Sequence, residues 1–157
     1  MISGVVSLSK LFSIFHDGCI VGHASQGSSL TLDVEIQYLA DLINPDYTSF
    51  RLIMRAVDGL LFRTWPNDAD AEGEQLTSAS LIFAPELEIL NASSEGDALK
   101  IMCNQSSGEW NYCGGELLLK VDSASVFDQG GREYSIDELE FICERYWSDW
   151  KTRNLKA

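Results

Sequence analysis

The stretch LTLDVEIQY, residues 30–38, constrains the fold more than any other part of this chain. Its apolar and polar side chains alternate strictly, and the apolar set is Leu30, Leu32, Val34, Ile36 and Tyr38. Because successive side chains on a strand point to opposite faces, a period of two buries one set and leaves the other in water. This alternation is typical of antiparallel strands with one solvated face. We therefore predict an antiparallel sheet.

Other apolar runs, separated by turn residues, predict further strands. Two Asp-Gly pairs, at residues 17–18 and 58–59, each lie between two such runs. An Asp-Gly pair in this position predicts a tight hairpin, because the turn needs positive φ at both central residues. The runs that flank these pairs and the other expected strands are KLFSIFH (10–16), CIVGHA (19–24), FRLIMRAV (50–57), LLFRTW (60–65), SASLIFA (78–84), LEIL (87–90), ALKIMCN (98–104) and ELLLKVDSASVF (116–127).

The end of the chain predicts one helix, from about residue 136 to residue 152. Ser135 and Glu138 form a capping box, in which the serine is the N-cap and the glutamate reaches back to it. An apolar stripe follows at three- and four-residue steps, so we expect it to pack on the sheet and to bury Trp150. Its members are Ile136, Leu139, Cys143, Tyr146 and Trp150. The length of 157 residues suits one domain, residues 1–157. We expect the α+β class: a mostly antiparallel sheet or sandwich of seven to nine strands with one C-terminal helix.

The charge balance is strongly acidic. The chain has 24 Asp and Glu against 11 Lys and Arg, a formal net charge of −13, and residues 64–99 contain eight acids and no Lys or Arg. A field of this sign repels nucleic-acid phosphates and anionic membranes, so neither is an expected partner, and it attracts basic proteins. The alternative is that the acidity only keeps the protein soluble.

The sequence also predicts a cellular location. The first residues, MISGVVSLSKLFSIF, lack the basic region and the long apolar core of a signal peptide. No run approaches the ~18 apolar residues that a membrane span needs. We therefore expect a cytoplasmic protein, in which the four cysteines are reduced thiols.

Both histidines lie close to a cysteine. His16, Cys19 and His23 have the spacing H-x2-C-x3-H, and all three residue types bind zinc. Cys19 and His23 would share one face of a strand because their separation is even, and His16 could approach them across the turn. A tetrahedral site needs a fourth ligand, which the sequence does not indicate. We expect a structural hairpin here, and the alternatives are metal binding and an acid–base role for His16 or His23.

The stretch PNDADAEGEQ predicts an acidic loop. Asp68, Asp70 and Glu72, followed by a glycine, match the first half of a calcium-binding loop. Such a loop needs a bidentate glutamate at its twelfth position, where this chain has Ala79. We therefore expect no cofactor here. A solvated loop is one interpretation, and a surface that docks a basic partner through these three acids and Glu74 is the other.

Nucleophile motifs are poor, and no catalytic residue is assigned. The chain has no G-x-S-x-G and no phosphate-binding glycine loop. Cys113, beside two glycines, could be a reactive thiol only if a histidine from the other end of the sequence reached it. Two aromatic residues in a polar stretch, Trp110 and Tyr112, are better candidates as exposed anchors for a partner, because interface hot spots favour such residues.

Three segments, FHDGCI (15–20), LTLDVEI (30–36) and GREYSIDELEFICERYWSDWK (131–151), together resemble small acidic bacterial proteins of the toxin-immunity class. This resemblance covers most of the chain and lends it no functional residues. It implies steric and electrostatic inhibition, in which the acids of residues 68–74 and Trp110 cover the active site of a basic toxin such as a nuclease. We therefore expect a protein-binding module and not an enzyme. The alternatives are a small-ligand or metal-binding domain, an enzyme, and a structural or assembly protein.

Overall fold

The computed structural model describes residues 1–155, which form four helices and eleven strands. The helices are α1 (Val5–Ile14), α2 (Gln37–Ala40), α3 (Ala79–Ile82) and α4 (Ile136–Leu155). The strands are β1 (Ile2–Ser3), β2 (Cys19–Gln26), β3 (Ser29–Glu35), β4 (Ser49–Arg55), β5 (Asp58–Pro66), β6 (Gln75–Leu76), β7 (Leu87–Glu95), β8 (Ala98–Asn104), β9 (Tyr112–Lys120), β10 (Ser123–Phe127) and β11 (Glu133–Tyr134). The α+β class and the C-terminal helix confirm the prediction. The expected seven to nine strands are too few, because β1, β6 and β11 have only two residues each and show no periodicity in sequence.

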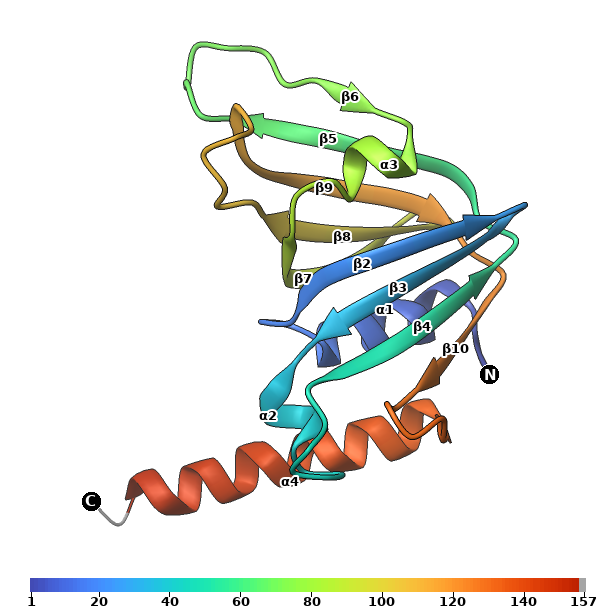
Figure 1. Cartoon of the computed structure of the whole chain (residues 1–157), viewed down its shortest axis with the longest axis vertical. Helices are drawn as coiled ribbons and strands as arrows, with labels where there is room; N and C mark the ends of the chain where they lie inside the picture. Colours follow the sequence, from blue (N-terminus) through green and yellow to red (C-terminus); the bar gives the residue numbers. More distant parts are fainter. Residues whose placement is uncertain (156–157) are drawn as a thin grey trace.

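The strands form one antiparallel sheet in the order β1-β10-β4-β3-β2-β7-β8-β9-β5-β6, with β11 also paired to β10. Two residues join β4 to β5, and two residues join β9 to β10. The strands β4 and β10 pair near one end of this order, and β5 and β9 pair near the other. The two short connections therefore link the two ends of the sheet. The sheet is therefore strongly bent, with an upper part around β5, β8 and β9 and a lower part around β2, β3 and β4 (Figure 1).

The core lies between the sheet and α1, which runs behind β3 and β4 in Figure 1. As predicted, Leu30, Leu32 and Val34 on β3 alternate with more exposed neighbours and are buried. On α1, Leu11 and Phe12 are fully buried in the same core. The helix also contacts β7, β8 and α4. One apolar core thus fixes both the sheet and the helix that supports α4.

Two of the expected strands are helices instead. Residues 10–16 belong mostly to α1, and residues 78–84 contain α3. Short apolar runs are compatible with the period of a strand and also with that of a helix, because their apolar side chains recur at three- and four-residue steps as well. Leu11 and Phe15 are one such pair in the first run, and both are fully buried, as is Ile82 in the second. Tertiary packing decides between the two periods.

Neither Asp-Gly pair makes the expected hairpin. Asp17 has a φ of 68°, but it turns the chain from α1 into β2. Its N–H donates to the carbonyl of Ile89 at 2.8 Å, which ties this turn to β7. At the second pair, Gly59 has a φ of 63°, yet β4 and β5 do not pair with each other. Together with Ala56, which has a φ of 55°, this pair bends the chain between two strands that each continue the sheet.

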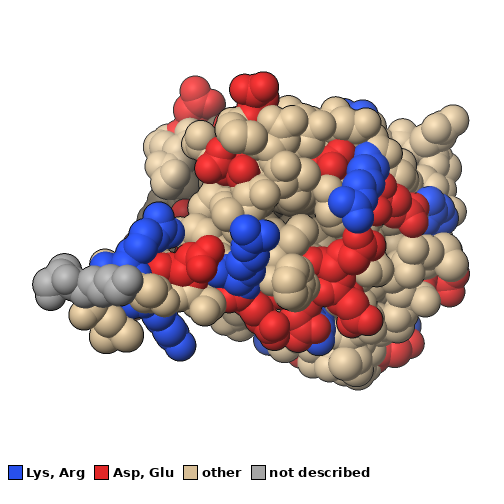
Figure 2. All heavy atoms as spheres, turned by 90° about the horizontal axis from the view of Figure 1, so that it is seen from below, with Lys and Arg blue, Asp and Glu red and all other residues tan. Residues whose placement is uncertain are grey.

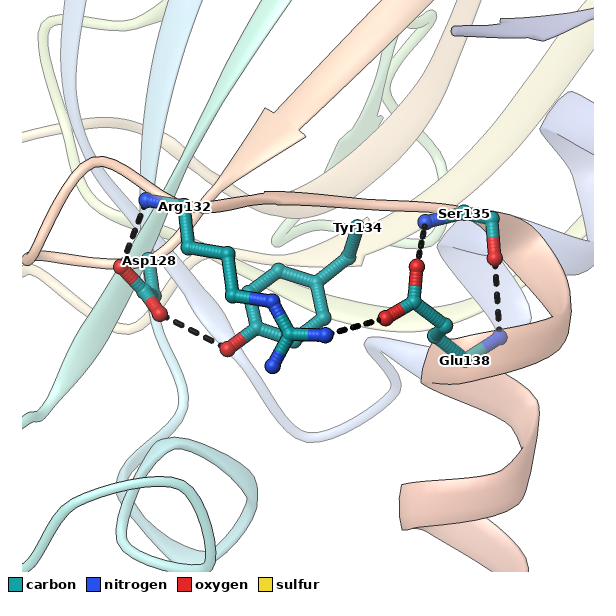
Figure 3. A network of polar contacts seen from close by, with 5 residues as sticks. All are labelled: Asp128, Arg132, Tyr134, Ser135 and Glu138. Carbon is teal, nitrogen blue, oxygen red and sulfur yellow. Dashed lines mark hydrogen bonds and ion pairs between the residues drawn. The ribbon is translucent and has the colours of Figure 1, made fainter.

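The capping box at the start of α4 is confirmed. The N–H of Glu138 donates to Ser135 Oγ at 3.1 Å, and the N–H of Ser135 donates to Glu138 Oε1 at 3.1 Å. Arg132 Nη2 donates to the other carboxylate oxygen of Glu138 at 2.6 Å, and the guanidinium lies 4.7 Å from the ring centre of Tyr134 (Figure 3). These contacts fix the angle at which α4 leaves the sheet.

A second carboxylate holds the turn before α4. Asp128 accepts hydrogen bonds from Tyr134 Oη at 2.7 Å and from Arg132 N at 3.1 Å (Figure 3). It also accepts one from Gly130 N at 2.8 Å. Burial disfavours the charged form, but these hydrogen bonds outweigh it and lower the pKa of Asp128. Burial and the bond to Asp128 raise the pKa of Tyr134 to about 12. We call the group of Asp128, Arg132, Tyr134, Ser135 and Glu138 the α4 junction.

The far half of α4 runs past the body of the protein (Figure 1). Of its expected stripe, Leu139 is fully buried, whereas Trp150 is 45% exposed. The prediction of a buried Trp150 is therefore wrong, because nothing in the described chain covers the last turns of the helix. Before this point, Tyr146 and Trp147 pack on Tyr38, with ring centres 4.6 and 6.1 Å away. No helix within residues 1–155 has both the length and the apolar character to cross a membrane.

Candidate partner-binding surface

The expected partner-binding residues gather at one end of the sheet. The loop of residues 67–74 follows β5, and the loop of residues 105–111 precedes β9. These strands pair, with Pro66 opposite Tyr112, so both loops leave the same end of one ladder. Figure 1 shows the two loops on the same side of the molecule. We call these two loops, with Glu86 beside them, the acidic end.

Backbone contacts fix the base of the β5–β6 loop and leave its acids free. Glu74 N donates to Thr64 Oγ1 at 2.8 Å, and Thr64 N donates to the Glu74 carbonyl at 2.9 Å. Asp68 Oδ1 accepts from Asp70 N at 3.0 Å, which shapes the turn. All four predicted acids of this loop are exposed, including Glu72. They are presented to solvent from a loop that is anchored at the rigid ladder.

The β8–β9 loop is held by a buried glutamine. Gln105 is 5% exposed, and its Nε2 donates to the Tyr112 carbonyl at 2.7 Å. Its Oε1 accepts from Ser107 N, so one side chain closes the loop from inside. Trp110 in this loop is half-buried, packs against the apolar core and lines a hollow of about 310 Å³ together with Pro85. The sequence does not reveal Gln105, because a polar residue in a polar loop gives no indication that it is buried.

The structure corrects the expectation for Tyr112. This residue begins β9 and is 8% exposed, so it is not an exposed anchor. Its ring lies 6.1 Å from that of Phe62, and its buried hydroxyl has no hydrogen-bond partner among residues 1–155. Burial, and then the charge of Glu74, raise the pKa of Tyr112. Trp110 and Tyr112 are two residues apart, but their environments differ, because only Tyr112 belongs to a strand of the sheet.

The charge of the acidic end is not neutralised within the described chain. No ion pair with any residue in 1–155 involves its six carboxylates. The nearest cations along the neighbouring strands, Arg63 and Lys100, both pair with Glu116, at 3.8 and 3.3 Å. The six carboxylates without an ion pair in residues 1–155 are those of Asp68, Asp70, Glu72, Glu74, Glu86 and Glu109.

The structure gives His16, Cys19 and His23 separate environments. The His16 ring stacks on Trp147 with ring centres 5.6 Å apart, and its Nδ1 lies 2.8 Å from the Ser13 carbonyl. His23 instead lies beside Phe83, with ring centres 5.5 Å apart. Burial and the neighbouring acids raise the pKa of the half-buried Cys19 thiol. Each histidine therefore contacts an aromatic ring of its own.

The metal and thiol alternatives gain no geometric support. Within residues 1–155, no group of three or more His, Cys, Asp or Glu side chains is placed to hold a metal ion. All four cysteines are free thiols. Cys113 is exposed and donates to the Trp65 carbonyl at 3.5 Å. Across the β8–β9 ladder, Cys103 lies opposite Gly115 rather than Cys113.

A second concave surface lies away from the acidic end. A hollow of about 640 Å³ is lined by β2, β3, β4, β10 and the turn after β10. Val21, Ile53 and Phe127 supply its apolar part. On its rim, Arg51 Nε donates to Asp33 Oδ1 at 2.9 Å. No motif marks this hollow in sequence, because four separate strands contribute to it.

Comparisons with known proteins give no family to which the chain could be assigned. No protein-family model matches it, and neither the curated proteins nor the solved structures provide a match.

Proposed function

We propose that this chain is a protein-binding module that docks its acidic end on a basic partner. The observation that carries the proposal is that six carboxylates, none of them in an ion pair with any residue in 1–155, lie at the same end of the sheet as the half-buried Trp110. A charged rim around an aromatic anchor is the arrangement that protein interfaces favour. In its most concrete form, the module is an immunity-type inhibitor of a basic bacterial toxin such as a nuclease.

The mechanism of such inhibition is electrostatic and steric. An enzyme that grips phosphates carries a basic active site, so the free acids of the β5–β6 loop would steer the two proteins together. Trp110 would then fill a pocket of the partner, and the bulk of the sheet would exclude the substrate. No catalytic group is needed on this chain.

The test is the association kinetics with basic toxin domains encoded beside this gene, measured over a range of salt concentrations. The variant D68N/D70N/E72Q/E74Q should lower the association rate about tenfold at low salt, and the difference should shrink as salt screens the charges. A matched control, E35Q/D41N/D46N/E95Q, changes the net charge equally with exposed acids that lie outside this loop. Equal effects of both variants, or an unchanged rate, would overturn the proposal.

A second function, binding of a small ligand, is favoured by the hollow of about 640 Å³ beside Arg51. Hollows of this volume hold small molecules, and the guanidinium keeps N–H groups that Asp33 does not occupy. The ligand would combine an apolar body with an acidic group. Naphthalene-2-acetate and the matching amine are suitable probes, because nuclear magnetic resonance shift mapping would show whether the acid alone binds beside Arg51. Preference for the amine would exclude this function.

A further inference from the structure

The outward face of α4 carries two isolated apolar side chains. Phe141 is 66% exposed and Leu155 is 84% exposed. Phe141 and Leu155 each lie seven residues from Ser148, which corresponds to about 10 Å along a helix. The directions of the three side chains around the helix axis differ by no more than about 40°, so they form one line along the helix surface. This line is opposite to the buried Leu139, and at one end of it Phe141 also lines a hollow with Arg132 and Tyr134. In Figure 1, α4 forms the lower boundary of the molecule.

The charges beside this line are free, unlike those nearer the sheet. Glu138 and Glu140 are engaged with other parts of the chain, through Arg132 at 2.6 Å and Lys10 at 2.6 Å. By contrast, four flanking residues form no ion pair with any residue in 1–155. They are Glu144, Arg145, Asp149 and Lys151.

Charge is also distributed unequally along α4. Residues 136–144 contain four acids and no Lys or Arg, whereas residues 145–155 contain Arg145, Lys151 and Arg153 against one acid. Seen from below, basic side chains lie close to the grey C-terminal atoms, and most of the acidic side chains lie farther from them (Figure 2). A parallel neighbour would bring like halves together, and an antiparallel neighbour brings unlike halves together.

We propose that this face of α4 binds the same face of a second copy, antiparallel and with the two-fold axis at Ser148. The symmetry places Phe141 of each copy against Leu155 of the other. Arg145 and Asp149 lie on one flank of the line. In a two-fold antiparallel pair, each flank of one copy lies beside the same flank of the other copy. Arg145 of one copy therefore faces Asp149 of the other. On the opposite flank, Glu144 faces Lys151 in the same way.

The small serine at the centre allows the two helices to approach closely. The contact is modest, because each copy supplies only two large apolar side chains. Such an interface lies below the ~1,200 Å² of stable complexes, and the dimer should dissociate in the micromolar to millimolar range. It leaves both acidic ends free, since they lie at the opposite end of the molecule from α4 (Figure 1). The dimer would therefore be bivalent.

Sedimentation velocity with the full chain tests the pairing. The sedimentation coefficient should rise between about 10 µM and about 1 mM, where weak complexes form. Arg145→Asp should weaken the dimer about tenfold, because it sets like charges against each other at two symmetric contacts. The double variant R145D/D149R should restore it. Arg153→Asp, an equal charge change on the inner side of the same helix, should change it much less.

Cross-linking tests the orientation. In a Cys113→Ser background, which removes the exposed native thiol, a short bismaleimide should join Ser148→Cys to itself. It should also join Phe141→Cys to Leu155→Cys when the two proteins are mixed, and neither of these to itself. Three results would overturn the proposal: one sedimentation coefficient at all concentrations, self-linking of Phe141→Cys, or a double charge variant that is no tighter than the single variant. Circular dichroism checks that each variant keeps its helix.

Discussion

The acidic end and the α4 junction both depend on carboxylate side chains, but the carboxylates have opposite surroundings in the two regions. At the junction, Asp128 accepts three hydrogen bonds and Glu138 accepts two. In the β5–β6 loop, the only hydrogen bond to a carboxylate from within residues 1–155 is the one from Asp70 N to Asp68. Carboxylates that are fully hydrogen-bonded fix the backbone, whereas carboxylates left in water mainly add charge to a surface. The comparison separates the acids that build this fold from those available to a partner.

The largest expected effect is on the packing that the junction supports. Leu139 is fully buried one residue after Glu138, so Leu139→Ala should lower the free energy of unfolding by about 3 kcal/mol. Urea denaturation followed by tryptophan fluorescence measures this change. Phe141→Ala, on the exposed face of the same helix, is the control and should change it by less than about 0.5 kcal/mol. Equal losses would mean that helix propensity, and not burial of Leu139, holds α4.

The next effect concerns Asp128. Asp128→Asn keeps the shape but replaces an acceptor of three hydrogen bonds by an uncharged amide, and it should lower the free energy of unfolding by about 2 kcal/mol. The same substitution at Asp68, whose side chain accepts one exposed hydrogen bond, should have a much smaller effect. Denaturation of both variants under identical conditions makes the comparison direct. A larger loss at Asp68 would reverse the roles of the two regions.

The pH dependence of stability should separate the regions in the same way. The pKa of Asp128 is lowered in the folded state, so its stabilisation is present above the unfolded pKa of about 3.9. It should be lost as the pH falls through the lower, folded pKa. Thermal melting from neutral pH to strongly acidic pH should show a steeper acid-side loss in the wild type than in Asp128→Asn. Parallel curves would show that Asp128 does not carry this dependence.

A smaller effect is expected at the helix cap. Ser135→Ala removes the Oγ acceptor of the Glu138 N–H and should lower the free energy of unfolding by about 1 kcal/mol. Ser135→Asp, which can still accept this bond, should retain most of the stability. Chemical denaturation of the two variants distinguishes the cap from a general effect of the position. Similar losses in both would argue that the backbone, without the side chain, sets the start of α4.

The parts of the fold that the sequence predicts best are those with local causes. The alternation that buries Leu30 and Leu32 lies within one strand, and the capping box of Ser135 and Glu138 spans four residues. The acidic loop was also predicted, because composition alone marks it. In each case the physical cause lies within a few residues of its effect, so one stretch of sequence is sufficient.

The failures have distant causes. Whether residues 10–16 form a helix depends on β7 and β8, which pack on α1 much later in the chain. Gly59 does occupy a turn conformation, but the strands it joins pair with β9 and β10, so its neighbours in sequence are not its partners. Tyr112 is buried because β9 begins there, and Gln105 is buried because its amide bonds to that strand. None of these pairings leaves a local pattern.

The smallest expected effect on stability is also the most informative about function. The variant D68N/D70N/E72Q/E74Q removes four exposed charges without an ion-pair partner in the described chain, so the free energy of unfolding should change by less than about 0.5 kcal/mol. Reduced repulsion could even raise it, because like charges in one loop destabilise the compact state. Denaturation at low and high salt measures the free energy of unfolding and the part of it that comes from charge repulsion. The wild type should gain stability with salt, and the variant should gain less. A loss of about 2 kcal/mol or more would show that these acids build the fold, as Asp128 does, and would remove the reason to assign them to a partner.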